Sequence, residues 1–326
     1  MDPWVTPLGH YAPRVSRLDR VAFVGGAIDR AAHRRSDPEL LGSLLADPGT
    51  RVVPMSGDGF VVADDGTFTP RPPEPGDAEA DLLVFLGEGP PAQTDGEPGG
   101  DEARTAYVLV AQPSAEADRP TVGLRELARS LDPDTAALVV TSLGLVNWHR
   151  THPRCSRCGA PTEAVLAGWI RRCPHDGSDH YPRTDVAVIM AVTDAADRLL
   201  LARAPSWPEG RMSVLAGFVE PGETLAQAVA REVHEEVGVE VRDVTYVADQ
   251  PWPFPSSLMV GFTARAVRTD LVLDPAEIAE ARWVARDEVA DLIEGGEYRP
   301  SPGFSISRAL VEDWFGGPLP SGPAGP

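Results

Sequence analysis

The sequence predicts an α/β fold: a sandwich of helices around a sheet from residue 184 onward, with a smaller β-rich domain before it. Two observations carry this prediction. From Asp185 the chain alternates apolar runs of strand length with amphipathic helical segments, the pattern of a layered α/β domain. The first 110 residues instead hold short apolar runs separated by stretches rich in Pro, Gly and acidic residues, which favours strands joined by solvent-exposed loops.

In the N-terminal region, residues 1–120, five apolar runs are expected to form strands: Val21–Val24, Arg51–Pro54, Phe60–Val62, Leu82–Leu86 and Ala106–Val110. The stretches 70–80 and 87–103 between them are expected to be mobile loops. This region contains no catalytic constellation, so we expect an architectural or dimer-forming domain.

The rest of the chain divides into four predicted parts. A helical linker spans 121–150, with helices over 124–131 and 134–149, and a compact cysteine-bearing motif spans 151–183. The α/β sandwich follows over 184–315, and the Pro- and Gly-rich residues 316–326 are expected to be a disordered tail. Within the sandwich, strands are expected at 186–192, 199–202, 240–248, 257–267 and 280–285, with a last helix near 303–315.

Composition limits the possible functions. The 326 residues carry a net charge of −20 and contain no lysine, which argues against a broad electrostatic footprint for DNA or RNA but not against one nucleotide in a pocket. No apolar run is long enough to span a membrane, and the N-terminus lacks the plan of a secretion signal. We therefore expect a cytoplasmic protein without a membrane partner.

One helix stands out, over residues 225–237. Thr224 and Gln227 fit a capping box at its start, and Gly238 is placed to end it. Its apolar stripe for the core comprises Leu225, Val229, Val233 and Val237. A glycine-containing loop leads into its N-terminus, where phosphate oxygens are favoured.

The same helix carries three carboxylates, Glu232, Glu235 and Glu236, at spacings i, i+3 and i+4. This spacing places them on one face, about 5–6 Å apart at Cβ. Clustered carboxylates repel one another unless a cation lies among them, and Mg²⁺ takes oxygen ligands of this kind. A surface helix with solvated glutamates is the alternative interpretation of these three residues alone.

The segment resembles the Nudix box, Gly-x5-Glu-x7-Arg-Glu-U-x-Glu-Glu-x-Gly-U, in which U is aliphatic. Every fixed position is filled, by Gly217, Glu223, Arg231, Glu232, Val233, Glu235, Glu236, Gly238 and Val239. The resemblance implies a Nudix α/β/α sandwich that binds Mg²⁺ or Mn²⁺ through the three box glutamates. Arg231 is expected to orient neighbouring carboxylates by a bidentate pair.

A second motif, Gln-Pro-Trp-Pro-Phe-Pro-Ser-Ser, lies eleven residues past the box. Its alternating prolines hold Trp252 and Phe254 in preset orientations, suited to stacking on a planar base. Composition alone favours a proline-rich loop packed on the core or a polyproline ligand for another protein. At this distance from the box, however, the string resembles the signature of the NADH pyrophosphatase subfamily, with Asp249 in place of its leading Ser.

This resemblance implies further site residues. Ala216 would offer its backbone carbonyl to the metal, and Glu277 would be a fourth metal carboxylate. Tyr181 and Phe218 would stack on rings of the substrate. Ser307 and Arg125 would contact phosphate or substrate backbone, although Arg125 also reads as an ordinary surface arginine. The dinucleotide pocket would be lined by Gln250, Pro251, Trp252, Pro253, Phe254, Pro255, Ser256 and Ser257.

The resemblance also implies an activity: hydrolysis of the pyrophosphate bond of NADH or NAD⁺ to nicotinamide mononucleotide and AMP, by a homodimer. Removal of the NAD cap from RNA 5′ ends is the same chemistry on a larger substrate, and a broader hydrolase of nucleoside diphosphate derivatives is a further alternative. A non-catalytic dinucleotide sensor is disfavoured because no box carboxylate is missing.

The cysteines form one cluster, Cys155, Cys158 and Cys173, which looks like three-quarters of a zinc ribbon. Structural zinc takes four ligands, and a Cys₃His set is accepted. In the family the fourth ligand is a cysteine, whose position by counting is Asp176 here. We expect structural Zn²⁺ with His175 as the fourth ligand, or His180 in its place. Alternatively the site has decayed and Trp169 holds the motif by packing.

Overall fold

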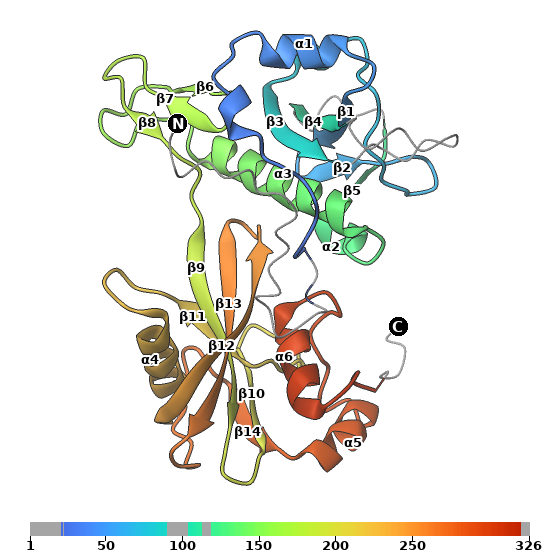
Figure 1. The fold of residues 1–326 in the computed structure, drawn as a ribbon. Helices are drawn as coiled ribbons and strands as arrows, with labels where there is room; N and C mark the ends of the chain where they lie inside the picture. The colour runs from blue at the N-terminus through green and yellow to red at the C-terminus, as the bar shows by residue number, and fades with distance from the viewer. Residues whose placement is uncertain (1–20, 22, 90–103, 113–118, 321–326) are drawn as a thin grey trace, which may run out of the picture. The chain divides into compact units, whose positions relative to one another are not determined.

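The computed structural model describes residues 21, 23–89, 104–112 and 119–320. Contacts divide these residues into two compact units, drawn in Figure 1. One comprises 23–185 with the short segment Pro251–Leu258, and the other comprises Val186–Gln250 and 259–320 together with Val21. The expected mobile loop 87–103 and tail 316–326 fall largely outside the described residues, from 90 to 103 and from 321 to 326.

A five-stranded sheet in the order β3-β4-β1-β2-β5 forms the centre of the first unit. Strands β1 and β4 run parallel, with Val53 opposite Leu109, and the other neighbours are antiparallel. The sheet is packed against helices α1 and α3, which explains why its inner strands are apolar runs without alternation. Its strands are β1 (Arg51–Ser56), β2 (Gly59–Val61), β3 (Leu82–Gly89), β4 (Thr105–Gln112) and β5 (Thr121–Val122).

Three helices and two 3₁₀ turns complete this part of the unit: η1 (Ala32–Arg34), α1 (Leu40–Ala46), η2 (Asp77–Glu79), α2 (Leu124–Leu127) and α3 (Pro133–Thr151). Helix α3 begins where the side chain of Asp132 accepts hydrogen bonds from two backbone N–H groups, with Pro133 at the first helical position. The helix then supplies a long buried surface to the sheet, as its apolar composition predicts.

The cysteine motif adds a small antiparallel sheet of β6 (Glu163–Val165), β7 (Ile170–Arg172) and β8 (Asp179–His180). Trp169, in the turn between β6 and β7, donates its indole N–H to the carbonyl of Phe85 in β3 at 2.7 Å. The guanidinium of Arg35 lies 3.8 Å from the centre of the same indole ring. The motif is therefore packed on the five-stranded sheet through Trp169.

The second unit is built on a six-stranded sheet in the order β12-β13-β9-β10-β14, with β11 paired to β9. Its strands are β9 (Asp185–Thr193), β10 (Leu199–Arg203), β11 (Leu215–Phe218), β12 (Val241–Trp252), β13 (Ser257–Ala266) and β14 (Glu280–Val284). Asp185, the first residue of β9, and residues 251–258, which include the end of β12 and the start of β13, are grouped with the first unit.

Figure 1 shows α4 (Leu225–Val237) on one side of this sheet, and α5 (Val289–Glu294) with α6 (Ile306–Phe315) on the other. The 3₁₀ turn η4 (Arg286–Glu288) leads into α5. A single core joins the sheet to the two C-terminal helices through side chains such as Leu199, Val284 and Leu310. This arrangement is the predicted α/β/α sandwich, with α4 as the helix that carries the acidic cluster.

Several elements differ from the prediction. The described residues of Val21–Val24 form no strand, although Val21 and Phe23 are buried. The helix predicted over 124–131 is a single turn. Helices α1 and α5 and strand β11 were not predicted. No helix among the described residues is both long enough and apolar enough to cross a membrane.

Candidate active site

Helix α4 forms as its sequence signals predict. The hydroxyl of Thr224 accepts the N–H of Gln227, and the Gln227 amide oxygen accepts the N–H of Thr224, which completes the capping box. Gly238 ends the helix in the left-handed region at φ 72°. The apolar side of the helix is buried through Val229, Val233 and Val237. This packing fixes the position of the acidic side of the helix relative to β11, which α4 contacts.

Arg231 gathers most of the acidic groups. Its guanidinium makes a two-pronged pair with Glu223, at 2.6 Å and 2.9 Å, and also donates to Glu232 at 2.8 Å and to Glu235 at 2.9 Å. A fifth hydrogen bond reaches the backbone carbonyl of Phe218 at 2.9 Å. These bonds lower the pKa of Glu223 to about 2 and raise the pKa of Arg231. Arg231 thus sits in the orienting geometry that the sequence predicts.

Glu236 is the exception in this cluster. Its side chain is only 7% exposed, and among the residues that the structure describes no hydrogen bond or ion pair engages its carboxylate. Burial raises the pKa of Glu236 to about 8, with further contributions from the charges of Glu232 and Glu277. A buried carboxylate without a partner is costly unless a cation compensates it, so the observation fits a divalent cation at this position.

Strand β11 forms the floor under these groups. Gly217 lies so close to the Glu232 carboxylate that an added Cβ would be 1.9 Å from its Cδ. Ala216, the expected carbonyl ligand, precedes it in β11 and pairs with Ile189 of β9. Gly217 is therefore required for space, since its φ is not in the left-handed region.

A loop after β13 approaches the same helix. The N–H groups of Val272 and Asp274 donate to the last carbonyls of α4, those of Val237 and Glu236, at 2.9 Å and 3.0 Å. This attachment brings Glu277, which is exposed, within electrostatic range of Glu232 and Glu236. The two carboxylates predicted to act together although they are distant in sequence, Glu236 and Glu277, thus belong to one acidic site.

The carboxylates do not form a closed cage. Within the described ranges, only the cysteine cluster has three or more ligand-type side chains with ligand atoms inside 4.8 Å of one another. Glu235 is 57% exposed and is turned toward Arg231.

The tip of the β12–β13 hairpin carries the proline-rich motif. The rings of Trp252 and Phe254 meet edge to face with centroids 5.0 Å apart, and Arg125 of α2 lies 4.2 Å from the centre of the Phe254 ring. Asn147 of α3 donates to the carbonyls of Pro253 at 3.1 Å and Pro255 at 3.0 Å. Asn147 was missed from the sequence, since one Asn on an apolar helix carries no local signal.

Two residues expected to contact substrate are instead buried and hydrogen-bonded within the protein. Gln250 is fully buried, and its amide bonds the carbonyl of Phe304 at 2.7 Å and the N–H of Ile306 at 2.8 Å. Its side chain anchors the start of α6, which corrects the expectation that it lines the pocket. The Ser307 hydroxyl is buried beside the hydroxyl of Ser213, at 2.7 Å, and also accepts from Ser301.

The remaining motif residues lie along the hairpin tip. Pro253 is buried, whereas Pro251 and Ser257 are half-buried and Pro255 is exposed. The Ser256 hydroxyl donates to the carboxylate of Asp185 at 2.8 Å, and the Asp185 N–H donates to the carbonyl of Ser256 at 2.8 Å. These bonds fix the tip against the start of β9.

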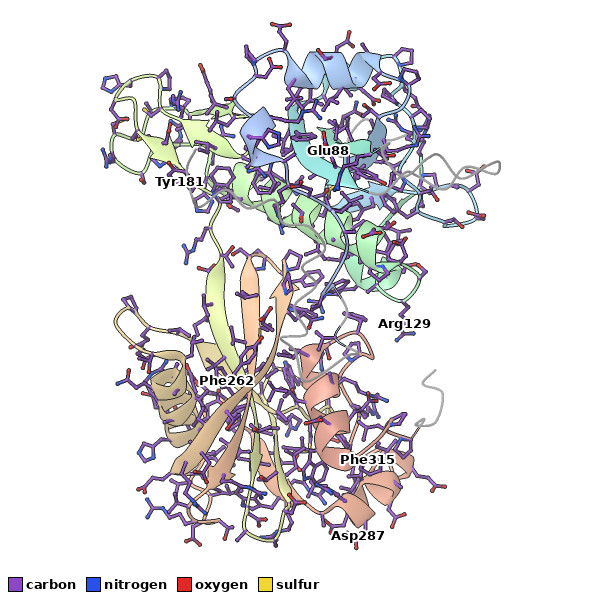
Figure 2. The ribbon with its side chains drawn as sticks, in the orientation of Figure 1. Glu88, Arg129, Tyr181, Phe262, Asp287 and Phe315 are labelled. Carbon is purple, nitrogen blue, oxygen red and sulfur yellow. The ribbon has the colours of Figure 1, made fainter. Side chains whose placement is uncertain are left out.

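The two predicted ring-stacking residues keep free aromatic surface. Tyr181 is 66% exposed just after β8, where Figure 2 labels it, and Phe218 is 59% exposed at the end of β11. An exposed aromatic ring offers a face on which a planar ring can stack. Tyr181 belongs to the first unit and Phe218 to the second. The exposure of each ring therefore supports a stacking role for that ring alone.

The three cysteines lie beside a fourth potential ligand, which differs from the histidine expected from the sequence. Ligand atoms of Cys155, Cys158, Cys173 and Asp176 lie within 4.8 Å of one another. His175 is exposed and is not part of this cluster, which corrects its assignment as the fourth ligand. Three sulfur atoms and one carboxylate are a donor set that fits zinc.

Comparison with known proteins agrees with this geometry. Residues 183–302 match the NUDIX domain family, and residues 150–181 match the NADH pyrophosphatase zinc ribbon domain. The NAD-capped RNA hydrolase NudC of Mycobacterium bovis is 45% identical over 62% of this chain and 68% of its own length. The chain belongs to the Nudix hydrolases, in the NADH pyrophosphatase subfamily.

Other relatives support the same placement in the Nudix hydrolases. NudC of Stutzerimonas stutzeri is 39% identical over 78% of this chain and 85% of its own length. The human NAD-capped RNA hydrolase NUDT12 is 40% identical over 55% of this chain and 42% of its own length. The predictions of an α/β Nudix fold and of a Nudix hydrolase are thereby confirmed.

Proposed function

We propose that this protein hydrolyses the pyrophosphate bond of NADH and NAD⁺, giving nicotinamide mononucleotide and AMP, with Mg²⁺ or Mn²⁺ as cofactor. The observation that carries the proposal is the buried Glu236, which has no hydrogen-bond or ion-pair partner among the described residues and lies within electrostatic range of Glu232 and Glu277. These three carboxylates, with the carbonyl of Ala216, would hold the cation. A bound divalent cation neutralises charge on diphosphate oxygens and acidifies water.

The protein's own groups supply the remaining tasks. Arg231 holds Glu232 and Glu235 in fixed positions and spends its hydrogen bonds on them, so it is not free to bind substrate. One carboxylate, Glu236 or Glu277, receives the proton of the attacking water.

The rings of the hairpin tip would select a dinucleotide. Trp252 and Phe254 are half-buried, and Asn147 holds the backbone of the neighbouring Pro253 and Pro255, so the two rings lose little freedom when a base stacks on them. Base–aromatic stacking is worth about 1–3 kcal/mol per base. Tyr181 and Phe218 would offer further rings, and Arg125, which packs on Phe254, would contact substrate phosphate.

Product analysis tests the proposal. The purified protein is incubated with NADH and Mg²⁺, or with Mn²⁺, and the nucleotides are separated by chromatography. AMP and reduced nicotinamide mononucleotide in equal amounts are expected, with none formed in excess chelator and far less formed by Glu236→Gln than by wild type. Intact NADH under both metals would contradict the proposal.

The names of the relatives favour a second substrate, RNA carrying an NAD cap. The cap presents the same pyrophosphate bond, but a net charge of −20 gives an RNA body little electrostatic attraction. We expect capped RNA to be cleaved with a rate that rises with salt more than the rate for free NADH. Cleavage of both NADH and unrelated nucleoside diphosphate derivatives at equal rates would favour the broader hydrolase.

We also propose that the protein acts as a cytoplasmic homodimer, and that residues 1–120, 121–150, 151–183 and 184–315 are its functional parts, followed by the tail 316–326. These inferences rest on the sequence and its resemblance to the subfamily. Sedimentation at several concentrations tests the dimer: a monomer at micromolar concentration would contradict it.

A further inference from the structure

Two turns of the cysteine motif have the same hydrogen bonds. In the first, the N–H of Cys155 donates to the carbonyl of Ala160 at 2.8 Å, and the N–H of Gly159 donates to the carbonyl of Cys155 at 2.9 Å. In the second, the N–H of Cys173 donates to the carbonyl of Ser178, five residues on as before, at 2.9 Å. The N–H of Gly177 closes that turn on the carbonyl of Cys173 at 2.9 Å.

The two turns also share their backbone conformation. Gly159 has φ 76° and Gly177 has φ 73°, a left-handed region that favours glycine, and each follows the third residue after a cysteine. In the first turn that third residue is Cys158. In the second turn the equivalent residue is Asp176, whereas His175 corresponds to Arg157, which is exposed. Asp176 therefore occupies the place of a ligand.

The distances between side-chain atoms agree with a tetrahedral site. With Zn–S bonds of about 2.3 Å and a Zn–O bond of about 2.1 Å, tetrahedral edges are about 3.8 Å between sulfurs and about 3.6 Å between sulfur and oxygen. The sulfurs of Cys158 and Cys173 are 3.5 Å apart, and Cys155 Sγ is 3.4 Å from Oδ2 of Asp176. These are two opposite edges of one tetrahedron.

The carboxylate is also oriented from behind. Oδ1 of Asp176 accepts the N–H of Ser178 at 2.9 Å and its hydroxyl at 2.6 Å, which leaves Oδ2 facing the cysteines. Partners of this kind fix ligand orientation in metal sites. The other histidine considered, His180, has ring nitrogens 3.3 Å from the Ser178 hydroxyl and 3.5 Å from the Ser156 hydroxyl, outside the cluster.

We infer that Asp176 is the fourth ligand of a Cys₃Asp zinc site, so that this chain keeps a working zinc ribbon although it lacks the fourth cysteine. The substitution keeps the charge of the ligand set, since carboxylate and thiolate are both anions. It replaces one soft sulfur by a hard oxygen, which zinc holds less strongly than a thiolate. The site is therefore complete but more readily emptied than a four-cysteine ribbon.

Metal content of the full-length protein tests the inference. Wild type, Asp176→Cys, Asp176→Ala and Asp176→Asn are purified with His175→Ala as the matched control from the neighbouring position. Zinc is measured by mass spectrometry after dialysis against a graded chelator. We expect one zinc in wild type and in His175→Ala, about 100-fold weaker binding in Asp176→Ala, and tighter binding in Asp176→Cys.

Cobalt substitution gives a second readout that does not depend on activity. Thiolate-to-cobalt absorption should be stronger in Asp176→Cys than in wild type and unchanged in His175→Ala, and circular dichroism checks that each variant is folded. If Asp176→Ala misfolds, the zinc content of Asp176→Asn and the cobalt spectrum of wild type test the inference in its place. The inference is overturned if His175→Ala loses the metal while Asp176→Ala keeps it. It is equally overturned if wild type binds no zinc and only Asp176→Cys does.

Discussion

Replacing Gly217 by alanine should disable the site through one carboxylate. The added Cβ would lie 1.9 Å from Cδ of Glu232 and 2.2 Å from both of its oxygens. Ordinary contact needs about 3.4 Å or more, so the carboxylate has to move by about 1.5 Å. The backbone of Gly217 is not in the left-handed region, so alanine adds no backbone strain there.

The expected loss follows from this displacement. A misplacement of about 1 Å in a catalytic site can cost about 100-fold in rate, equivalent to about 2.7 kcal/mol of transition-state stabilisation. We expect kcat/KM for NADH to fall by about 100-fold or more, and Mn²⁺ to bind more weakly. The protein should remain folded, because Glu232 lies at the edge of the buried stripe of α4.

A matched control separates this effect from a general cost of alanine. A Cβ at Gly303, in the same unit, would meet nothing within 4 Å, and its φ is also outside the left-handed region. Gly303→Ala should keep wild-type kinetics. In a double-mutant cycle, Gly217→Ala should add little to the loss caused by Glu232→Gln. Kinetics of Gly217→Ala within threefold of wild type would refute the reasoning.

Three further outcomes follow from other contacts. Glu236→Gln should lower kcat/KM by about 10³-fold, yet leave the metal-free protein at least as stable as wild type at pH 8, because it removes a buried carboxylate whose pKa is raised. Asn147→Ala should raise KM for NADH about tenfold with little change in kcat, since two hydrogen bonds to the hairpin tip, together worth about 1–2 kcal/mol, are lost. His149, which accepts from Arg171 and donates to the carbonyl of Gly168, has a pKa lowered by burial to about 4. As pH falls, His149 is therefore protonated in the unfolded chain before it is protonated in the folded protein. About 3 kcal/mol of the free energy of unfolding should be lost as pH falls from 6.5 to 4. In urea unfolding, His149→Asn should not show this loss.

Each of these outcomes can fail in a distinct way. Near-normal turnover by Glu236→Gln would exclude it as the central metal ligand. A fall in kcat without a change in KM for Asn147→Ala would mean that the tip does not position the substrate. Equal loss of stability on acidification for wild type and His149→Asn would show that other groups, not this imidazole, account for acid sensitivity.

The sequence predicted the elements whose signals are local. Helix α4 has a cap, a stripe and a stop within fifteen residues, and the structure contains all three, except that Leu225 at the start of the stripe is exposed. The apolar run at Val21 was wrongly taken as a strand because its burial depends on neighbours distant in sequence. Strand β11 escaped notice for a related reason: it exists through pairing with β9, and its own composition, with Gly217 inside, reads as a loop.

Site residues divide in the same way. Asn147 bonds carbonyls more than one hundred residues further along the chain, and nothing in its own surroundings marks it. The motif at Gln250 was recognised correctly as a unit, yet a string of letters cannot tell a residue that lines a pocket from one that anchors the loop. Only the packing of α6 reveals that Gln250 belongs to the second class.

The helix carboxylates show most clearly what spacing leaves open. Spacings of i, i+3 and i+4 place Glu232, Glu235 and Glu236 on one side of α4. Spacing alone does not distinguish their burial or their pairing. The structure makes them unequal, because Arg231 neutralises two of them while Glu236 remains buried and without a partner among the described residues. A cation gains most by approaching the one charge that the protein has not compensated. It is therefore from burial and pairing, and not from spacing, that we propose Glu236 as the central ligand.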